Sequence, residues 1–381
     1  MTTNTEIPPR ADVWQRSPPA EVGFDESGIE AAVAYVCEHE TDWLIDLSEQ
    51  KAIAGDEPPP WSEILGPLKP RGGPAGVIVS RGKIIAEWGK ADRVDTTFSA
   101  TKSYIALCAL VALRLGLIRG LDDLLQDYGL CAHFGALQNQ KISWRHLLQQ
   151  TSEWEGTLWT KPDQVDRNRQ VGPGSRTSAK GGPRRLCPPG THWEYNDVRV
   201  NLAALCLTLL FGRPLGEVLR EHIMDPIGAS RSWEWYGYRN SWVEVNGQAI
   251  PSVSGGAHWG GGLWISAKDH ARMGLLIARG GSWGGHEVLP RNLIAQLFEP
   301  CKLNPSYGLM WWLNTDCKMF ASAPESSVFA YGAGANYVWV DAPRDLVAVV
   351  RWINSDFMDG FIARVMGAAT ACPDSALGSR C

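Results

Sequence analysis

The sequence predicts a mixed α/β (α+β) fold, in which a mostly antiparallel sheet is flanked by helices and a helical region is inserted in the middle of the chain. Two β-rich segments, 75–89 and 335–353, lie far apart in the 381-residue chain. Between them the apolar residues recur mostly with helical spacing, and Gly and Pro mark the joints. One sheet assembled from both ends of the chain accounts for this order.

Each β-rich segment is predicted to form an antiparallel hairpin. The first, "AGVIVSRGKIIAEWG", turns at Arg81-Gly82, and the second, "ANYVWVDAPRDLVAVVRWI", turns at 342–345. Apolar periodicity then predicts the helices. They are expected at 100–115, 145–150, 197–211, 215–223, 267–279 and 358–370.

The same order suggests how the chain is divided. Residues 1–98 and 260–381 are expected to form the α/β sheet region, and 99–259 a mainly helical region, with the two packed as one unit. Segment 160–190 is polar, rich in Gly and Pro, and without periodicity. It is predicted to be a long surface loop of the kind that often acts as a lid.

Composition and charge restrict the partners. The chain is 44% hydrophobic and 20% charged, with a formal net charge of −5, as in ordinary globular proteins. Without a surplus or dense run of Lys and Arg, we expect no nucleic acid and no membrane partner, but a small molecule. The N-terminal segment lacks the pattern of a secretory signal, and no segment approaches the ~18 uninterrupted apolar residues of a membrane span. A cytoplasmic location is predicted.

Cysteine and histidine give little sign of a metal or redox site. The 9 cysteines include no CxxC pair and fit a reducing compartment better than a disulfide framework. Buried, inert thiols are favoured over a catalytic cysteine. The 8 histidines form no HExxH motif, and His258 and His270 are too far apart to share one helical face. We therefore expect neither a metal nor an organic cofactor.

The stretch "TTFSATKSYIALCALVALRLG" (96–116) places Ser99 three residues before Lys102. The following residues are apolar on nearly all sides, which predicts a helix buried in the interior. At this spacing the lysine amine can reach the serine hydroxyl, and burial disfavours the ammonium, so Lys102 can act as a base. The backbone N–H of Ser99, at the helix start, can stabilise an oxyanion. The alternative is a helix cap followed by a lysine that reaches solvent.

A second serine, Ser282, lies in a formal GxSxG pattern at 280–284. That pattern is a nucleophile elbow only between a strand and a following helix. Here "SAKDHARMGLLIARGG" predicts a helix before the serine, and "WGGHEVLP" predicts a turn into an extended segment. Ser282 is therefore disfavoured as a nucleophile.

Two further stretches carry candidate site residues. In "GTHWEYNDVRVNLAALCLTLLFG", Tyr195, Asn196 and Asp197 come just before an apolar helix, where they can move protons and orient a leaving group. A buried tyrosine with an Asn/Asp cap is the alternative. In "FAYGAGANYVWV", the small residues 332–335 lead into a strand, where a substrate can lie against exposed backbone. A kink required by packing is the alternative there.

With these elements in this order, residues 20–370 resemble the superfamily of serine β-lactamases and penicillin-binding proteins. The resemblance is greatest to its class C-like branch, which includes family VIII carboxylesterases, aminohexanoate-oligomer amidases and D-aminopeptidases. SATK carries the SxxK motif at Ser99 and Lys102, and Tyr195 begins the equivalent of Tyr-x-Asn. Segments 142–156 and 259–274 are similar to two structural signatures of the family.

Two departures from the family pattern bear on the substrate. Asp197 occupies the third position of Tyr-x-Asn, so a carboxylate replaces the amide that contacts substrate in lactamases. Tyr331-Gly332-Ala333 replaces the Lys-Thr-Gly or His-Thr-Gly motif, which removes the cation that would meet the carboxylate of a β-lactam or peptide. Both changes argue against an antibiotic as the substrate.

The resemblance implies a β-lactamase/transpeptidase-like fold and a serine hydrolase that works through an acyl-enzyme. Ser99 is the expected nucleophile, Lys102 coupled to Tyr195 the expected base, and Tyr195 the proton donor to the leaving group. The backbone N–H groups of Ser99 and Ala333 are expected to hold the oxyanion, with a slip to Gly334 or Ala335 as the alternative. The residues expected to line the substrate site are Asn196, Asp197, Tyr331, Gly332, Gly334 and Trp259.

A carboxylesterase acting on small esters is the favoured activity. An amidase acting on small linear or cyclic amides comes next, followed by a β-lactamase or DD-peptidase and by acyl transfer to an acceptor other than water. The alternative from a different class is a lactamase-like scaffold that binds a ligand without catalysis.

Overall fold

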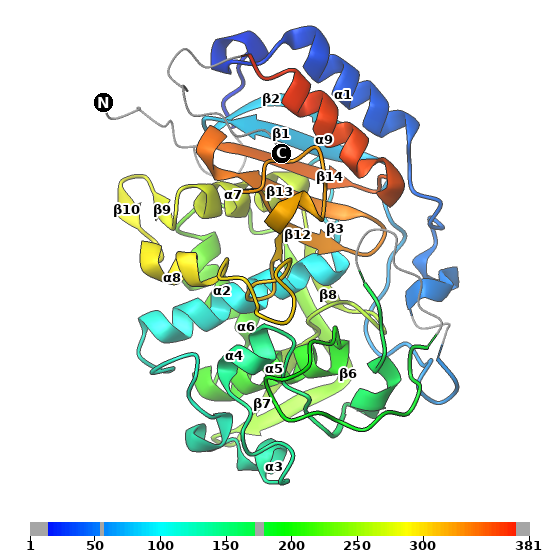
Figure 1. Ribbon diagram of the computed structural model, residues 1–381, viewed down its shortest axis with the longest axis vertical. Coiled ribbons are helices and arrows are strands. Elements are labelled where there is room, and N and C mark those ends of the chain that lie inside the picture. Colours follow the sequence, from blue (N-terminus) through cyan, green and yellow to red (C-terminus); the bar gives the residue numbers. More distant parts are fainter. Residues whose placement is uncertain (1–13, 54–56, 172–178, 371–381) are drawn as a thin grey trace.

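The computed structural model describes residues 14–53, 57–171 and 179–370. An antiparallel sheet forms the upper part of the molecule in Figure 1, and helices with a second sheet form the lower part. The upper sheet has six strands in the order β11-β12-β13-β14-β1-β2, so both ends of the chain build it, as predicted. Its strands are β1 (Ala75–Ser80), β2 (Lys83–Trp88), β11 (Trp312–Leu313), β12 (Val328–Gly332), β13 (Asn336–Asp341) and β14 (Leu346–Arg351).

Both predicted hairpins are confirmed. β1 pairs with β2 through Arg81 and Gly82, whose φ angles of 52° and 83° are the two positive values that a type I′ turn requires. β13 pairs with β14, and the chain reverses there through a short turn that ends at Asp345, with φ 44°. β1 also pairs with β14 from Ala75↔Arg351 to Ser80↔Leu346, which joins the two ends of the chain.

Helices cover both faces of the six-stranded sheet. α1 and α9 pack together on one face, and α7 lies on the other (Figure 1). Alternation along β1 matches this arrangement, since Val77 and Val79 belong to the core on the α7 side and Ile78 to the core on the α1 side. These helices are α1 (Glu26–Glu38), α7 (Ala267–Ala278) and α9 (Met358–Gly367).

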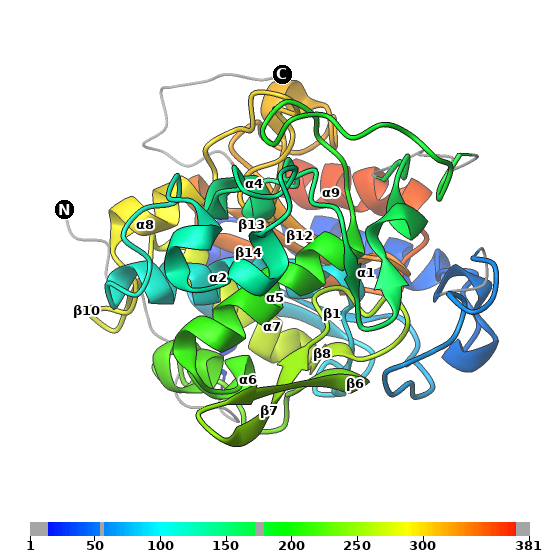
Figure 2. The ribbon, with the colours of Figure 1, turned by 90° about the horizontal axis from the view of Figure 1, so that it is seen from below.

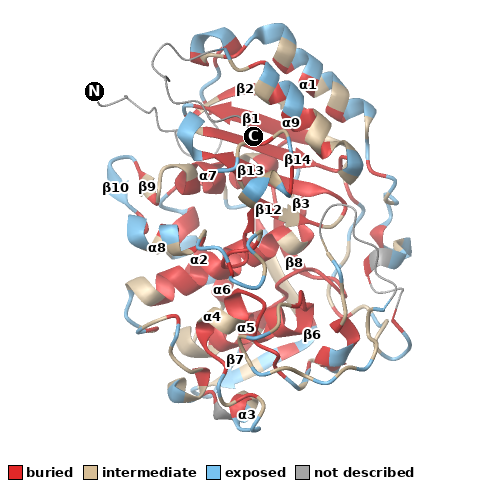
Figure 3. Ribbon diagram, in the orientation of Figure 1, coloured by how far each residue is buried: buried red, intermediate tan, exposed pale blue. Residues whose placement is uncertain are grey.

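The lower part is built around α2, which lies beside α5 (Figure 2). Twelve of the fourteen residues of α2 are buried, as its apolar sequence predicts, and Figure 3 shows the helix almost wholly red. The main helices here are α2 (Thr101–Arg114), α4 (Trp144–Leu148), α5 (Asp197–Phe211) and α6 (Leu215–Leu219), which continues as a π-helical turn over Arg220–Met224. The second sheet has the order β3-β8-β6-β7 and consists of β3 (Asp95–Thr96), β6 (Glu234–Val245), β7 (Gln248–Val253) and β8 (Gly262–Ile265).

The remaining elements are short. They are α3 (Cys131–Phe134), α8 (Arg291–Gln296), β4 (Thr157–Leu158), β5 (Lys161–Pro162), β9 (Ser282–Trp283) and β10 (His286–Glu287). Ser282 follows α7 and lies in the β9–β10 hairpin, so the strand-before-helix setting of a nucleophile elbow is absent there, as predicted.

Two features differ from the expectations. The long hairpin β6–β7 lies within the region predicted to be mainly helical. Many residues of its two strands are exposed or half-buried, so the sequence there has no continuous apolar run that would have predicted a strand. The start of the predicted surface loop is instead buried, because charged residues there pair with one another and with α5. These buried residues are Lys161, Asp163, Asp166 and Arg167. The proposed division at 98/99 and 259/260 stays a prediction.

Within the described parts of the chain, no single helix is long and apolar enough to cross a membrane, although α5 and Leu215–Met224, bent by 76°, pass that test as a pair. Of five free thiols, three are buried as predicted, whereas Cys187 is half-buried and Cys37 is exposed. The prediction is wrong for Cys317, which is disulfide-bonded. The free thiols are those of Cys37, Cys108, Cys187, Cys206 and Cys301.

Candidate active site

Ser99 lies in a one-turn 3₁₀ helix, Phe98–Ala100, that leads directly into α2. The preceding residue, Phe98, has φ 46°, a strained value for a non-glycine residue, and its ring packs edge-on against Trp43 at 5.2 Å and Trp352 at 6.2 Å between ring centres. This packing holds the turn in place. Ser99 itself is partly exposed, whereas its neighbours Phe98 and Ala100 are buried.

Lys102 is buried beside Ser99, with 1% of its surface exposed. Its Nζ donates a hydrogen bond to Ser99 Oγ at 2.8 Å and lies 2.5 Å from Asp197 Oδ1. The alternative of a lysine that reaches solvent is therefore wrong. Burial lowers the pKa of Lys102, and the Asp197 carboxylate opposes this by raising it.

Tyr195 completes the group around Ser99. Its ring centre lies 4.7 Å from Lys102 Nζ, and the ring stacks on Trp312 at 6.1 Å. The nearby Ser99 side chain lowers the pKa of Tyr195. Burial raises the pKa of Tyr195, and the Asp197 carboxylate raises it further. In this state of the site, Tyr195 is therefore a neutral phenol.

The two residues after Tyr195 serve the protein interior. Asn196 caps α5: its Oδ1 accepts from Arg199 N at 3.2 Å, and its Nδ2 donates to the Asp163 carbonyl at 2.8 Å. Fully buried, Asn196 takes the capping role instead of the substrate contact expected from the sequence. Asp197, also expected to contact substrate, binds Lys102 instead.

Asp197 has a second cation, Arg169, on its other carboxylate oxygen. The Arg169 guanidinium lies 5.3 Å from the Tyr195 ring centre and 3.3 Å from Asp166 Oδ2, which in turn accepts from Asp197 N at 2.7 Å. Lys102 and Arg169 hold the pKa of Asp197 far below its usual range, so its carboxylate is ionised. Ser99, Lys102, Tyr195, Asp197 and Arg169 are called the Ser99 site below.

Sequence reasoning missed Arg169, Asp166 and Gly256. The first two lie in the segment predicted to be a surface loop, where the charged run "DQVDRNRQ" was the available signal. A Cβ at Gly256 would overlap Lys102 Nζ and would lie 2.6 Å from Asp197 Oδ1. Only glycine fits this position without displacing the ion pair; the Gly-Gly pair at 255–256 was its sequence signal.

The turn after β12 lies against the Ser99 turn. A Cβ at Gly332 would overlap the Thr97 carbonyl and approach Ala100 N to 3.1 Å, so glycine permits this contact between the two backbones. Asn336 Nδ2 donates to the Ala333 carbonyl at 2.8 Å and fixes the turn that includes Gly334. Tyr331 stacks on Tyr337 with ring centres 4.6 Å apart. The predicted oxyanion segment is thus next to the helix start that carries Ser99.

Trp259 is fully buried, and its indole N–H donates to Glu57, so it belongs to the interior and does not wall a cleft. Glu57, Asp166 and His258 could in principle hold a metal. Lys180 Nζ lies between them, 2.6 Å from Glu57 and 3.3 Å from both Asp166 and His258. A lysine ammonium already neutralises this group, so the donor set does not fit an additional metal cation.

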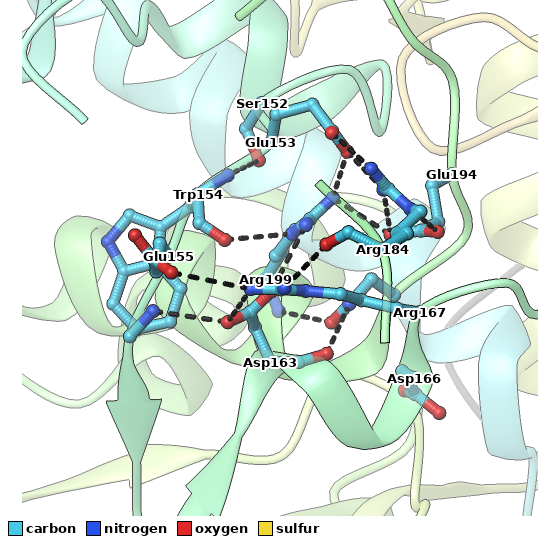
Figure 4. Close-up of polar contacts among 12 residues, drawn as sticks. Ser152, Glu153, Trp154, Glu155, Asp163, Asp166, Arg167, Arg184, Glu194 and Arg199 are labelled. Carbon is cyan, nitrogen blue, oxygen red and sulfur yellow. Dashed lines mark hydrogen bonds and ion pairs between the residues drawn. The ribbon is translucent and has the colours of Figure 1, made fainter. Parts of the chain in front are cut away.

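A second set of buried charges joins α5 to the neighbouring loops (Figure 4). Arg199 Nη1 lies 2.9 Å from Glu153 and its Nη2 3.1 Å from Asp163, while Arg184 binds both oxygens of Glu153 at 2.6 Å. These pairs lower the pKa of Glu153 to about 2. This group is called the arginine cluster and comprises Glu153, Asp163, Arg167, Arg184, Glu194 and Arg199.

A serine whose hydroxyl is bonded to a buried lysine beside a buried tyrosine, at the start of a buried helix, defines a site of the serine-hydrolase type. The Beta-lactamase family matches residues 71–361, and the chain belongs to that family. No curated protein sequence matches the chain.

Solved structures share this fold at low sequence identity. A family VIII carboxylesterase is 16% identical, over 78% of this chain and 92% of its own, with a TM-score of 0.56. EstCE1, a hydrolase with promiscuous acyltransferase activity, is 15% identical over 91% and 99%, with a TM-score of 0.55. A Bacillus anthracis protein provisionally named a 6-aminohexanoate-dimer hydrolase is 17% identical over 74% of each chain, with a TM-score of 0.54.

Proposed function

We propose that this member of the Beta-lactamase family is a serine hydrolase that cleaves small carboxylic esters through an acyl-enzyme. The observation that carries the proposal is the 2.8 Å hydrogen bond between Lys102 Nζ and Ser99 Oγ, in a site where burial lowers the pKa of the lysine. A nucleophile bonded to a buried amine is an activated nucleophile.

In the proposed reaction, neutral Lys102 takes the proton of Ser99 as Oγ bonds to the ester carbonyl carbon. The N–H groups of Ser99 and Ala333 hold the resulting oxyanion. Tyr195 gives its proton to the leaving alkoxide when the ester C–O bond breaks, and Lys102 returns a proton to Tyr195. Water then attacks the acyl-enzyme by the same route and releases the acid and Ser99.

The pair Asp197–Arg169 takes the place of the neutral amide found in lactamases. A carboxylate alone, 2.5 Å from Lys102 Nζ, would stabilise the ammonium and oppose its use as a base. Arg169 binds the other oxygen of Asp197 and lowers the pKa of Lys102. The two charges together approximate a neutral group, so Lys102 stays available as a base.

An ester is favoured because Tyr331 stands where lactamases have a cation. Losing a charge-assisted hydrogen bond to a substrate carboxylate costs about 1.5–3 kcal/mol, or roughly ten- to a hundredfold in binding. The carboxylesterase and EstCE1 structures give this reading additional weight, with acyl transfer as a side reaction. A small-amide amidase is the second candidate, suggested by the aminohexanoate-dimer hydrolase. A small-molecule partner and a cytoplasmic location remain predictions.

A substrate panel tests the proposal. Short-chain p-nitrophenyl esters, the matching anilides and nitrocefin are compared by kcat/KM with the same enzyme preparation. We expect the esters to exceed nitrocefin by about ten- to a hundredfold or more. Anilides turned over faster than esters would indicate an amidase, and nitrocefin equal to the esters would contradict the role given to Tyr331. A fluorophosphonate that fails to label the protein would favour a binding scaffold without catalysis.

A further inference from the structure

A cavity of about 390 Å³ lies where β1, β3 and β14 meet the start of α7, apart from the residues of the Ser99 site. Its volume falls within the range of about 300–1,000 Å³ that is common for small-molecule sites. The residues that matter for the argument are Arg71, Lys90, Arg93, Asp95, Arg351 and Trp352. Four of these six side chains are cationic and one is a carboxylate.

The single carboxylate of the lining, Asp95, already accepts from four donors, and Arg93 is the one cation among them. Its Oδ1 accepts from Thr96 N at 3.0 Å. Its Oδ2 accepts from Gly72 N at 2.6 Å, Trp352 Nε1 at 3.1 Å and Arg93 Nε at 3.4 Å. Arg71 is paired outside the lining, with Glu40 at 2.6 Å. Among the residues that the structure describes, Lys90 and Arg351 form no ion pair with a carboxylate.

Arg351 is the most notable of these cations because only 3% of its surface is exposed. Its guanidinium donates to neutral acceptors: Asn336 Oδ1 at 2.7 Å, the Ile265 carbonyl at 3.0 Å and the Thr96 carbonyl at 2.5 Å. Within residues 14–53, 57–171 and 179–370, no carboxylate oxygen lies within 4.0 Å of it. Burial lowers the pKa of Arg351, as expected for a buried charge without an ion-pair partner.

Lys90 and Arg93 stand at the open side of the cavity on one turn, in which Arg93 N donates to the Lys90 carbonyl at 2.9 Å. Lys90 is exposed, and the side chain of Arg93 is 41% exposed. A Cβ at Gly73 would meet nothing within 4 Å, so space is open beside them. Two exposed cations thus flank the entrance, with the buried Arg351 behind them; Arg93 Nη2 donates to the Pro70 carbonyl at 2.6 Å.

We propose that this cavity is a second ligand site, which binds a small anion, either an organic carboxylate or a phosphate. Arg351 supplies the fixed charge at the back, and Lys90 and Arg93 close on the anion from the solvent side. Trp352, Pro74 and Ala75 add apolar wall, which leaves room for the carbon skeleton of an organic acid. The site is independent of the proposed ester hydrolysis, because Ser99, Lys102 and Tyr195 do not line it.

Isothermal titration of the full-length protein with sodium phosphate and with sodium succinate tests the proposal, at an ionic strength held constant with sodium chloride. The variant Lys90→Gln/Arg93→Gln removes the two exposed cations and leaves Arg351 in place. Lys302→Gln is the matched control, an exposed lysine outside the cavity lining. We expect the double variant to bind at least about tenfold more weakly and the control to bind like the wild type.

Tighter binding of succinate would assign the site to carboxylates, and tighter binding of phosphate would assign it to phosphates. The proposal would be overturned if neither anion released or absorbed more heat than a control titration with sodium chloride. The same affinity in the wild type and in Lys90→Gln/Arg93→Gln would also overturn it, since the anion would then bind elsewhere. Equal melting temperatures of the variants would show that the comparison concerns folded proteins.

Discussion

The arginine cluster and the Ser99 site are both buried sets of charges next to α5, but they hold their charges differently. In the arginine cluster, guanidinium groups meet carboxylates through pairs of directed hydrogen bonds, as Arg184 does with both oxygens of Glu153 (Figure 4). In the Ser99 site, Lys102 and Arg169 each bring a single nitrogen to Asp197. The first arrangement fixes geometry, whereas the second leaves the balance of charge adjustable.

This difference indicates that the arginine cluster serves the stability of the fold, whereas the Ser99 site serves catalysis. Removing one residue from a fully paired set of buried charges costs much stability, because its partners stay buried without a counter-charge. At the Ser99 site, the lysine also donates to a neutral hydroxyl, so its proton can move without breaking a larger network. Variants of the arginine cluster should therefore alter folding, and variants of the Ser99 site should alter turnover and its pH dependence.

The largest effect is expected for Ser99→Ala. Removing the nucleophile should lower kcat for p-nitrophenyl esters by about 10⁴-fold or more and abolish fluorophosphonate labelling, since the remaining groups cannot form an acyl-enzyme. Ser282→Ala, in the β9–β10 hairpin, is the matched control and should retain its activity. Intact-mass detection of an adduct in the Ser99→Ala protein would contradict this assignment.

Glu153→Gln is expected to give the largest effect on stability. The carboxylate contributes stability at neutral pH, and that contribution is lost as the pH falls from 4.5, its ordinary pKa, to about 2. The difference between these values corresponds to about 3 kcal/mol in the free energy of unfolding. Denaturant unfolding at pH 7 measures the loss. Glu155→Gln is the control, because that side chain is 61% exposed and its contact with Arg167 is long, at 3.9 Å. Equal losses of unfolding free energy in the two variants would contradict the comparison.

Tyr195→Phe should lower kcat by about a hundredfold, because the ring and its stacking on Trp312 remain while the proton donor is lost. Its melting temperature should change little. Tyr307→Phe removes a neighbouring buried hydroxyl, 6.3 Å away between ring centres, and should leave kcat near that of the wild type. A Tyr195→Phe enzyme with full kcat would show that Tyr195 serves only for packing.

Local sequence signals predicted much of this molecule. The hairpins, most helices and the Ser99–Lys102 contact depend on residues close together in the chain, where turn chemistry and helical spacing apply. The Arg169–Asp197 pair was missed because its members are 28 residues apart and Arg169 lies in a segment without periodicity. Helix α1 was missed because it buries a narrow stripe of small and medium residues, Ile29, Ala32 and Val36.

Asn196 shows a different limit of the sequence. Its position before an apolar helix fitted both a cap and a substrate ligand, and the two atoms that distinguish these roles, Arg199 N and the Asp163 carbonyl, are supplied by folding. Tyr195 shows the same for protonation, since its burial and the carboxylate of Asp197 determine the direction of its pKa change.

The smallest effect on activity is expected from Arg169→Met. This variant tests most directly how the Ser99 site differs from the arginine cluster. Without Arg169, Asp197 acts on Lys102 alone and raises the pKa of the lysine. Activity rises with pH as Lys102 loses its proton, so the rising limb of the kcat/KM profile should move to higher pH. At pH 7 this amounts to about a tenfold loss for a change of one pKa unit, with recovery in alkaline buffer. A general loss of packing would lower activity at every pH and leave the limb in place.

Asp197→Asn supplies the opposite change and the control. It removes the counter-charge of Lys102, lowers the pKa of the lysine further and should move the limb to lower pH. The double variant Asp197→Asn/Arg169→Met restores a neutral amide with no facing cation, so its limb should return close to that of the wild type. Opposite single shifts that cancel in the double variant would show that the two charges act on Lys102 additively and with opposite sign. If the rising limb of the Arg169→Met profile lay at the wild-type pH, Arg169 would serve only to hold its loop in place. The Ser99 site and the arginine cluster would then both be structural charge clusters.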